Sequence, residues 1–196
     1  ISDSLTVQGH FLEIPGYDYK INSYVFVDGT TLFNEDIIRI MNSVTGTDGN
    51  DILEATALHS RLYGMGGNDI LYGSAGNDLY LFKPGDGADN LIETDGNDTV
   101  AFDVDMLNLI FSNDSGLKIR YGANDTLDIA SWDVADSYKV ETFESSDGYE
   151  LSSANVQLLI SAMNDFALSN NMSWNEAVQQ RPNDVTSILQ QFWVRQ

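Results

Sequence analysis

The sequence predicts a mainly β protein in which short strands stack on one another, with antiparallel β and helical segments around the stack and a helical C-terminus. Three observations support this prediction. The tripeptide Gly-Asn-Asp recurs at a nine-residue period, two stretches near the ends of the chain alternate apolar and polar residues, and apolar residues beyond about residue 153 follow helical spacing. A chain of 196 residues can form one or two domains with a core of their own.

The composition is strongly acidic. Nine basic and thirty acidic residues give a formal net charge of -21. This charge disfavours nucleic acid, anionic membranes and acidic polysaccharides as partners, and it suits a protein that takes up cations. The chain has no cysteine, so an extracellular protein of this kind needs another source of stability, for which bound metal is the obvious candidate. No apolar run approaches the roughly 20 residues of a membrane span.

The nine-residue period is the strongest signal in the sequence. Gly-Asn-Asp occurs at 49–51, 67–69, 76–78 and 96–98. In one frame, the successive segments are GTDGNDILE (46–54), ATALHSRLY (55–63), GMGGNDILY (64–72) and GSAGNDLYL (73–81). The second segment has lost its glycines and aspartate but keeps an apolar eighth position, so four apolar residues fall nine apart: Leu53, Leu62, Leu71 and Tyr80. A register kept through a degraded copy indicates a structural repeat.

These segments follow the pattern G-G-x-G-x-D-x-U-x, and the chain therefore resembles the RTX (repeats-in-toxin, haemolysin-type calcium-binding) family. Glycine permits the positive φ angles and close backbone approach that a tight turn around an ion requires. The three residues around each apolar eighth position favour a β-strand whose central side chain points inward. Gly-Asn-Asp is also ordinary turn chemistry, but three copies in frame with an apolar ladder favour the calcium interpretation.

The resemblance implies a right-handed parallel β-roll in which two nonapeptides form one coil, so that turns 18 residues apart stack. Asp51 is then expected to face Asp69 across a calcium ion, whereas Asp78 faces Ser60, a poor ligand. In the exit segments KPGDGADNLIE (83–93) and TDGNDTVAF (94–102), Asp86 or Asp89 is expected beneath the turn at 64–69, and Asp98 with Asp95 beneath the turn at 73–78. About three calcium ions are expected. The candidate ligands are Asp51, Asp69, Asp78, Asp86, Asp89, Asp98, Asp95, Gly46, Asp48, Gly49, Gly64, Gly66, Gly67, Gly73, Ala75 and Gly76.

A second, longer repeat relates the two ends of the chain. DSLTVQGHF (3–11) parallels DTLDIASWD (125–133), and YKINSYVFVDGTTLFNEDI (19–37) parallels YKVETFESSDGYELSSANV (138–156). Each copy predicts a hairpin, at Asp28-Gly29 or Asp147-Gly148, followed by a helix capped at Asn34 or at Ser152 or Ser153. These copies resemble the haemolysin-type calcium-binding related domain that often follows RTX repeats.

We therefore predict four parts. Residues 1–44 are the C-terminal part of a preceding flanking module, 45–102 are the β-roll, 103–168 are a second flanking module, and 169–196 are a helical tail. Ile1 then falls inside a module, and we expect an earlier β-roll to precede it in a longer protein. The flanks are expected to cap the open ends of the roll.

The C-terminal region carries helix signals. Apolar residues recur at helical spacing in 153–168, Ser173 and Glu176 form a predicted capping box, and Asp184 is expected to cap a helix over VTSILQQFWV. This tail resembles the uncleaved C-terminal signals that type I secretion machinery reads in this family. A packed cap on the fold is an equally good interpretation, and the two are compatible.

Catalytic motifs are absent from the sequence. It contains no Gly-x-Ser-x-Gly, no P-loop and no HExxH, and His10 and His59 have no identifiable partner nucleophile. Aromatic side chains at Tyr63, Tyr72, Tyr80 and Trp132 could line a sugar-binding surface, although strand packing explains them more simply. We predict no catalytic residue, and no cofactor other than calcium.

The resemblance implies a calcium-binding module of a large secreted bacterial protein, an adhesin or a toxin. Such a module folds on binding calcium outside the cell and supports type I secretion. Its expected partners are calcium, the type I machinery, and a cell-surface glycan or protein, with no nucleic acid and no membrane span. Two alternatives stay open: the folding and secretion tail of an exported hydrolase, and a glycan-binding adhesin module.

Overall fold

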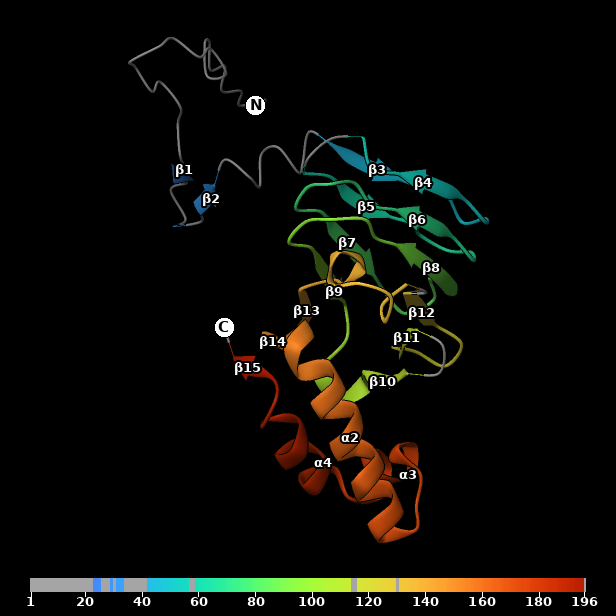
Figure 1. The fold of residues 1–196 in the computed structure, drawn as a ribbon, viewed down its shortest axis with the longest axis vertical. Coiled ribbons are helices and arrows are strands. Elements are labelled where there is room, and N and C mark those ends of the chain that lie inside the picture. Colours follow the sequence, from blue (N-terminus) through green and yellow to red (C-terminus); the bar gives the residue numbers. More distant parts are fainter. Residues whose placement is uncertain are drawn as a thin grey trace.

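The structure, a computed structural model, describes residues 23–25, 29, 31–33, 42–56, 59–113, 116–129 and 131–195. Over these residues the protein is mainly β, with two large mixed sheets and a group of helices near the C-terminus (Figure 1). A separate two-stranded sheet precedes them. The predicted mainly β class and helical C-terminus are confirmed.

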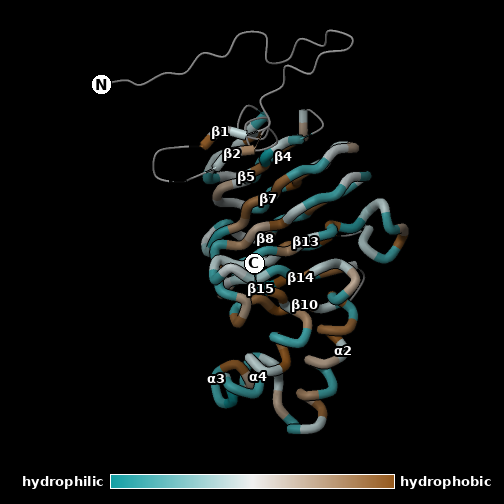
Figure 2. The backbone as a smooth tube through the Cα atoms, turned by 90° about the vertical axis from the view of Figure 1, so that its left-hand side faces the viewer, coloured by the Kyte–Doolittle hydropathy of each residue, from teal (hydrophilic) through white to brown (hydrophobic). Residues whose placement is uncertain are grey.

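Seven short strands follow one another in the repeat region, and they alternate between the two sheets. Strands β3, β5, β7 and β9 lie in one sheet, and β4, β6 and β8 lie in the other. All neighbours within each set pair in parallel. Their bounds are β3 Ser43–Thr45, β4 Ile52–Glu54, β5 Arg61–Tyr63, β6 Ile70–Tyr72, β7 Leu79–Phe82, β8 Ala88–Ile92 and β9 Thr99–Phe102. Figure 2 shows the successive coils stacked above the helices.

The strand register follows the nine-residue period. Leu53 pairs with Leu71, and Leu71 with Leu91. In the other sheet, Leu62 pairs with Tyr80, and Tyr80 with Val100. These six side chains are buried between the sheets, as predicted for the first four of them. Because each strand contributes only one inward side chain, or two in the longer strands, the apolar interior of the stack is narrow.

The flank continues both sheets. Strand β12 (Thr126–Ile129) pairs in parallel with β8, and β13 (Thr142–Ser145) pairs in parallel with β9. The remaining strands are antiparallel: β10 (Ile110–Asn113), β11 (Leu117–Arg120), β14 (Tyr149–Ser152) and β15 (Val194–Arg195). Two 3-10 turns, η1 (Met106–Asn108) and η2 (Asp136–Tyr138), join these strands. The change to antiparallel pairing ends the stack on its C-terminal side.

Both hairpins predicted from the long repeat are present. Strands β1 (Ser23–Val25) and β2 (Thr31–Phe33) pair antiparallel, and β13 pairs with β14 in the same way. Gly29 has φ +89 and Gly148 has φ +79, the left-handed region that such turns need. The helix predicted after Asn34, and the first copy of the repeat at 3–11, lie outside the described residues.

Three helices follow the second hairpin: α2 (Ser153–Asn170), α3 (Trp174–Gln180) and α4 (Pro182–Leu189). The capping box at α3 is confirmed, because the Glu176 amide donates to Ser173 Oγ at 3.2 Å and the Ser173 amide donates to Glu176 Oε2 at 2.7 Å. The prediction that Asp184 caps the last helix is wrong. Proline favours the first turn of a helix, so α4 begins at Pro182 and Asp184 lies inside that turn.

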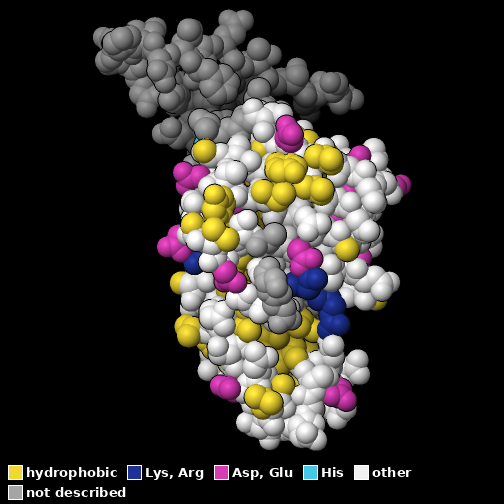
Figure 3. Space-filling view, turned by 45° about the vertical axis from the view of Figure 1, so that its right-hand side comes forward, with side chains coloured by type: hydrophobic (Ala, Val, Ile, Leu, Met, Phe, Trp, Pro, Cys, Tyr) yellow, Lys and Arg dark blue, Asp and Glu magenta, His cyan; other side chains and the backbone are white. Residues whose placement is uncertain are grey.

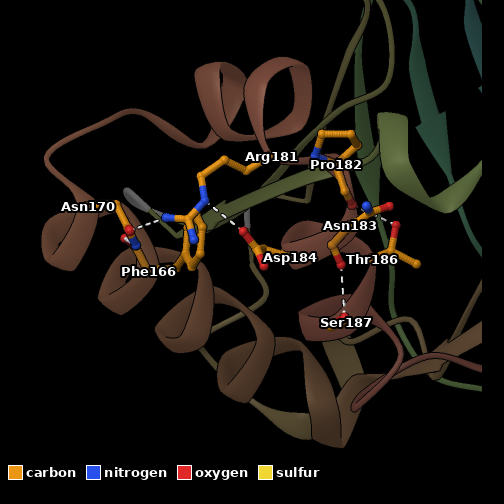
Figure 4. Close-up of polar contacts among 8 residues, drawn as sticks. All are labelled: Phe166, Asn170, Arg181, Pro182, Asn183, Asp184, Thr186 and Ser187. Atoms are coloured by element: carbon orange, nitrogen blue, oxygen red, sulfur yellow. Dashed lines mark hydrogen bonds and ion pairs between the residues drawn. The ribbon is translucent and has the colours of Figure 1, made fainter.

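Arg181 joins the three helices. Its guanidinium donates to Asp184 Oδ2 at 2.6 Å and to Asn170 Oδ1, and it lies 5.1 Å from the ring centre of Phe166 on α2 (Figure 4). The Arg181 side chain therefore connects the end of α2 to the start of α4.

Aromatic side chains fill the junction between the stacked strands and the flank, and the flank itself. Phe82, Phe102 and Tyr121 lie against one another with ring centres 5.2 to 5.9 Å apart, and Phe111 packs edge-on against Phe143. Tyr80 and Trp132 are also buried, so they are not available to a sugar-binding surface. Apolar side chains are exposed over the upper part of the face in Figure 3. Two apolar residues of the stack strands are exposed, Ile52 at 67% and Tyr72 at 36%.

Candidate metal site in the strand turns

Aspartates in the turns stack directly above one another on each side of the molecule. The first series, here called column one, contains Asp51, Asp69 and Asp89. The Asp51 amide donates to Asp69 Oδ1 at 2.8 Å, and the Asp69 amide donates to Asp89 Oδ1 at 2.9 Å. The carboxylates of Asp69 and Asp89 therefore each accept a hydrogen bond from the aspartate one coil earlier, which fixes their positions in the turns.

Column two repeats this geometry on the other side, with Ser60, Asp78 and Asp98. The Ser60 amide donates to Asp78 Oδ1 at 2.7 Å, and the Asp78 amide donates to Asp98 Oδ1 at 2.7 Å. The structure thus brings Asp51 above Asp69 and Ser60 above Asp78, at the spacing that the sequence predicts. Both columns are mostly buried: Asp69, Asp78 and Asp98 are fully buried, and Asp89 is 2% exposed.

Two flank residues extend the columns. The Asp98 amide donates to Glu141 Oε2 at 2.7 Å, so Glu141 occupies the next position in column two. The Gly87 amide donates to Asp125 Oδ1 at 3.2 Å, close to the end of column one. Sequence reasoning missed both residues. Asn124-Asp125-Thr126 repeats the order Asn97-Asp98-Thr99 and could have revealed Asp125, whereas Glu141 lies outside any nonapeptide.

Asp86 and Asp95, two of the four aspartates predicted in the exit segments, lie outside the columns. Asp89, and not Asp86, lies beneath Asp69. Asp86 instead accepts from the Lys83 amide at 2.6 Å, and its carbonyl oxygen accepts from the Gly67 amide at 2.9 Å. Asp95 is exposed, its carboxylate accepts from the Gly96 amide, and its backbone pairs with Ala75. Asp48 is also exposed.

The glycines of the turns make room for oxygen atoms. A Cβ at Gly64 would lie 2.2 Å from Asp69 Oδ2, and one at Gly46 would lie 2.4 Å from the Gly64 carbonyl oxygen. Gly67 has φ +131 and lies against Gly49. A Cβ on Gly67 would lie 2.7 Å from the Gly49 carbonyl group. Carbonyl and carboxylate oxygens therefore crowd together at positions where side chains are absent.

The other predicted glycine positions differ in their surroundings. At Gly66 a Cβ would meet only ordinary contacts, the nearest at 3.7 Å. At Gly73 it would meet the Tyr80 hydroxyl and the Glu93 carboxylate at 2.3 to 2.6 Å. The Gly76 carbonyl oxygen lies 2.4 Å from the position of a Cβ on Gly96.

Glu93 is a buried acid that the sequence analysis did not single out. It is 1% exposed, it accepts from the Tyr80 hydroxyl at 2.5 Å, and it accepts from the Thr94 amide at 2.8 Å. Glu93 occupies the first position of the turn ETDGND (93–98), where the turns at 46, 64 and 73 have glycine. This alignment was the signal that could have found it.

Burial raises the pKa of several of these acids. Loss of hydration, followed by the charges of Glu93, Asp78 and Glu141, raises the pKa of Asp98 to about 8. Loss of hydration likewise raises the pKa of Asp89 to about 6 and that of Glu93 to about 7, and it raises the pKa of Asp69. In the absence of a cation, ionised carboxylates in the columns are thus unfavourable.

The donor set fits a hard cation. Asp69 Oδ2 and Asp98 Oδ2 are buried and have no hydrogen-bond partner among the described residues. In the same part of the chain, the ion pairs are Lys118–Asp128, Lys139–Asp136 and Arg181–Asp184, so none of them involves a column aspartate. The described residues contain no group of three or more His, Cys, Asp or Glu side chains arranged to hold a metal. A bound ion would therefore need backbone carbonyl oxygens as well, which calcium accepts readily.

Comparison with known protein families identifies the repeat region. Residues 45–80 match the RTX calcium-binding nonapeptide repeat in four copies. Residues 45–80 are RTX calcium-binding repeats. RTX repeats in general bind calcium, their family is typically non-catalytic, and the proteins that carry them are generally secreted. None of the curated proteins compared with the chain matches it. No helix among the described residues is long and apolar enough to cross a membrane.

Proposed function

We propose that the protein is a calcium-binding module whose RTX repeats fold when calcium occupies the turns outside the cell. The observation that carries this proposal is the pair of buried aspartate columns, which no lysine or arginine of the described residues neutralises. Burying a carboxylate without a partner is costly, so a fold that buries several of them needs cations or protons.

The residues that would hold calcium are the column aspartates and the carbonyl groups of the turns. Column one would contribute Asp51, Asp69 and Asp89, and column two would contribute Asp78 and Asp98. The crowding of carbonyl oxygens around Gly46, Gly67 and Gly96 supports an oxygen-only site. Calcium bound there would neutralise the carboxylates and hold adjacent coils together. With that ion in place, the alternating parallel strands would form a right-handed β-roll.

The difference in calcium concentration between the cytosol and the outside of the cell would then determine where the repeats fold. Extracellular calcium modules have dissociation constants of about 0.1–1 mM, far above cytosolic calcium. Calcium at about ten times the dissociation constant adds roughly 1.4 kcal/mol of stability per site. The repeats would stay unfolded in the cytosol, as export of an extended chain by type I machinery requires, and would fold after export. We propose a large secreted adhesin or toxin as the parent protein, with residues 169–196 as a candidate secretion signal and the module itself non-catalytic.

The direct test is a calcium titration of the chelated protein, followed by far-UV circular dichroism and calorimetry, with magnesium as the control ion. We expect β signal to rise with calcium, with a midpoint near 0.1–1 mM, and not with magnesium. A chelated protein that is already fully folded and does not respond to calcium would overturn the proposal.

A further inference from the structure

The four Gly-Asn-Asp turns differ in how they satisfy the second carboxylate oxygen of their aspartate. In the turn at 46–51, Asp51 Oδ2 accepts from the Thr47 amide at 2.6 Å and from the Thr47 hydroxyl at 2.8 Å. In the turn at 73–78, Asp78 Oδ2 accepts from the Ser74 amide at 3.0 Å and from the Ser74 hydroxyl at 3.1 Å. A hydroxyl residue at the second position therefore closes each of these turns from within.

The other two turns lack this closure. At 64–69 the second position is Met65, which has no hydroxyl, and at 93–98 the Thr94 amide donates to Glu93 instead of Asp98. Asp69 Oδ2 and Asp98 Oδ2 are consequently left without a partner within the described residues, although both side chains are completely buried. A buried acceptor left unsatisfied costs about 1–3 kcal/mol, and more when it is charged.

In both open turns a glycine lets oxygen atoms approach its backbone closely. The Cβ position of Gly64 lies 2.2 Å from Asp69 Oδ2. The Cβ position of Gly96 lies 2.4 Å from the Gly76 carbonyl oxygen and 2.8 Å from Asp98 Oδ2. Each open turn thus combines a buried, unpaired carboxylate oxygen with a glycine whose missing side chain lets that oxygen approach the backbone.

We propose that the protein has two principal calcium sites, one at Asp69 Oδ2 in column one and one at Asp98 Oδ2 in column two. The turns of Asp51 and Asp78 are closed by hydroxyl groups and require no ion of their own. This inference rests on the proposed calcium binding, and it reduces the three ions expected from the sequence to two that dominate. It also places one site in each column, so that calcium holds both sides of the stack.

Single Asp→Asn substitutions in the full chain test this inference by stability without calcium. Asn keeps an oxygen for the amide one coil earlier but replaces the second oxygen by an N–H₂ donor. D69N and D98N replace a buried acid whose second oxygen has no partner by a neutral amide, so we expect each to raise the far-UV β signal of the protein in chelator. D51N and D78N remove an acceptor of two hydrogen bonds, so we expect neither to raise that signal. A rise in all four variants, or in none of them, would overturn the inference.

Calorimetric calcium titration of the same variants gives a second, independent readout. We expect two binding events in the unchanged protein and one event in D69N and in D98N. In D51N and D78N we expect two events with affinities within about tenfold of the original. Loss of an event in D51N or D78N but not in D69N or D98N would overturn the inference. An unchanged protein that binds no calcium would instead overturn the proposed function itself.

Discussion

The stack of short parallel strands (42–102), which includes the RTX repeats at 45–80, and the region that follows it (103–195, here called the flank) share the same two sheets but are stabilised by different means. The stack buries two ladders of apolar side chains, one from each sheet, together with two columns of aspartates. The flank buries the aromatic cluster of Phe111, Trp132, Phe143 and Trp193. The ion pairs of the described residues all lie within it: Lys118–Asp128, Lys139–Asp136 and Arg181–Asp184. The flank also has three helices packed together and against its sheets, which the stack lacks.

This difference shows that pairing of strands does not by itself make a region stable. A strand of three residues orders its backbone at a cost of about 1–2 kcal/mol per residue, and one buried leucine returns only about 1.5–3 kcal/mol. The stack therefore depends on neutralisation of its buried acids. The flank depends on it less, because its apolar burial is larger and its ion pairs are partly exposed, although its acids Asp125 and Glu141 extend the columns. We expect the two regions to respond differently to calcium, to pH and to matched substitutions.

Calcium removal should have the largest effect. In chelator, we expect backbone amides of residues 42–102 to exchange with solvent within seconds to minutes, while amides in the middle of α2 stay protected. Hydrogen exchange followed by mass spectrometry measures this for each segment. Equal loss of protection in the stack and in α2 would show that the two regions form one cooperative unit and would contradict the comparison.

The pH dependence of the calcium-free protein should come next. The pKa of Asp98 is raised from 3.8 to about 8 and that of Asp89 from 3.8 to about 6, so the folded stack retains protons that the unfolded chain has released. Below about pH 4 both states are protonated and the stack is not penalised. As pH rises from about 4 to 8, the free energy of unfolding should therefore fall.

Far-UV circular dichroism of calcium-free protein between pH 5 and 8 measures this effect, and we expect more β signal at pH 5 than at pH 8. With millimolar calcium the trend should reverse, because protons compete with the ion for the same carboxylates. A calcium-free stack that gains stability as pH rises would be inconsistent with buried, raised-pKa acids.

Matched leucines compare the two cores. Leu71 in the stack and Leu159 in α2 are both completely buried, and truncation of either to alanine should cost about 2–5 kcal/mol. In calcium-loaded protein, we expect L71A to raise the calcium midpoint and L159A to leave it nearly unchanged while lowering the stability of the helices. Circular dichroism at several calcium concentrations distinguishes the two. A similar rise of the calcium midpoint in both variants would refute separate stabilisation.

The sequence predicted the stack well because its period determines which residues meet. Leu53, Leu62, Leu71 and Tyr80 were expected to point inward, and all four are buried. The positions of Asp51 above Asp69 and of Ser60 above Asp78 followed from the same 18-residue spacing. In a repeat with fixed rise, sequence distance and spatial distance are proportional.

The sequence did not predict which acids meet where the repeat spacing changes or ends. The spacing lengthens from 18 to 20 residues in the segment KPGDG before β8, so the sequence could not decide between Asp86 and Asp89, and the structure places Asp89 in column one. Glu141 joins column two 43 residues after Asp98, across several flank strands. No local pattern reports such a contact, because it depends on how the flank folds back onto β9.

The smallest predicted effect concerns two glycines in the same turn of the stack. Gly87 has φ +102, and a Cβ there would lie 1.9 Å from the Gly67 carbonyl oxygen, whereas Gly85 has φ +98 and open space around it. Both substitutions to alanine strain the backbone by a similar amount, so the difference between G87A and G85A isolates the close approach of two coils. Overpacking of this kind typically costs about 1–3 kcal/mol.

We expect G87A to be less stable than G85A by about that amount in urea unfolding with saturating calcium. Equal stabilities would mean that adjacent coils have room for a methyl group, and that glycine at this position serves only the local turn.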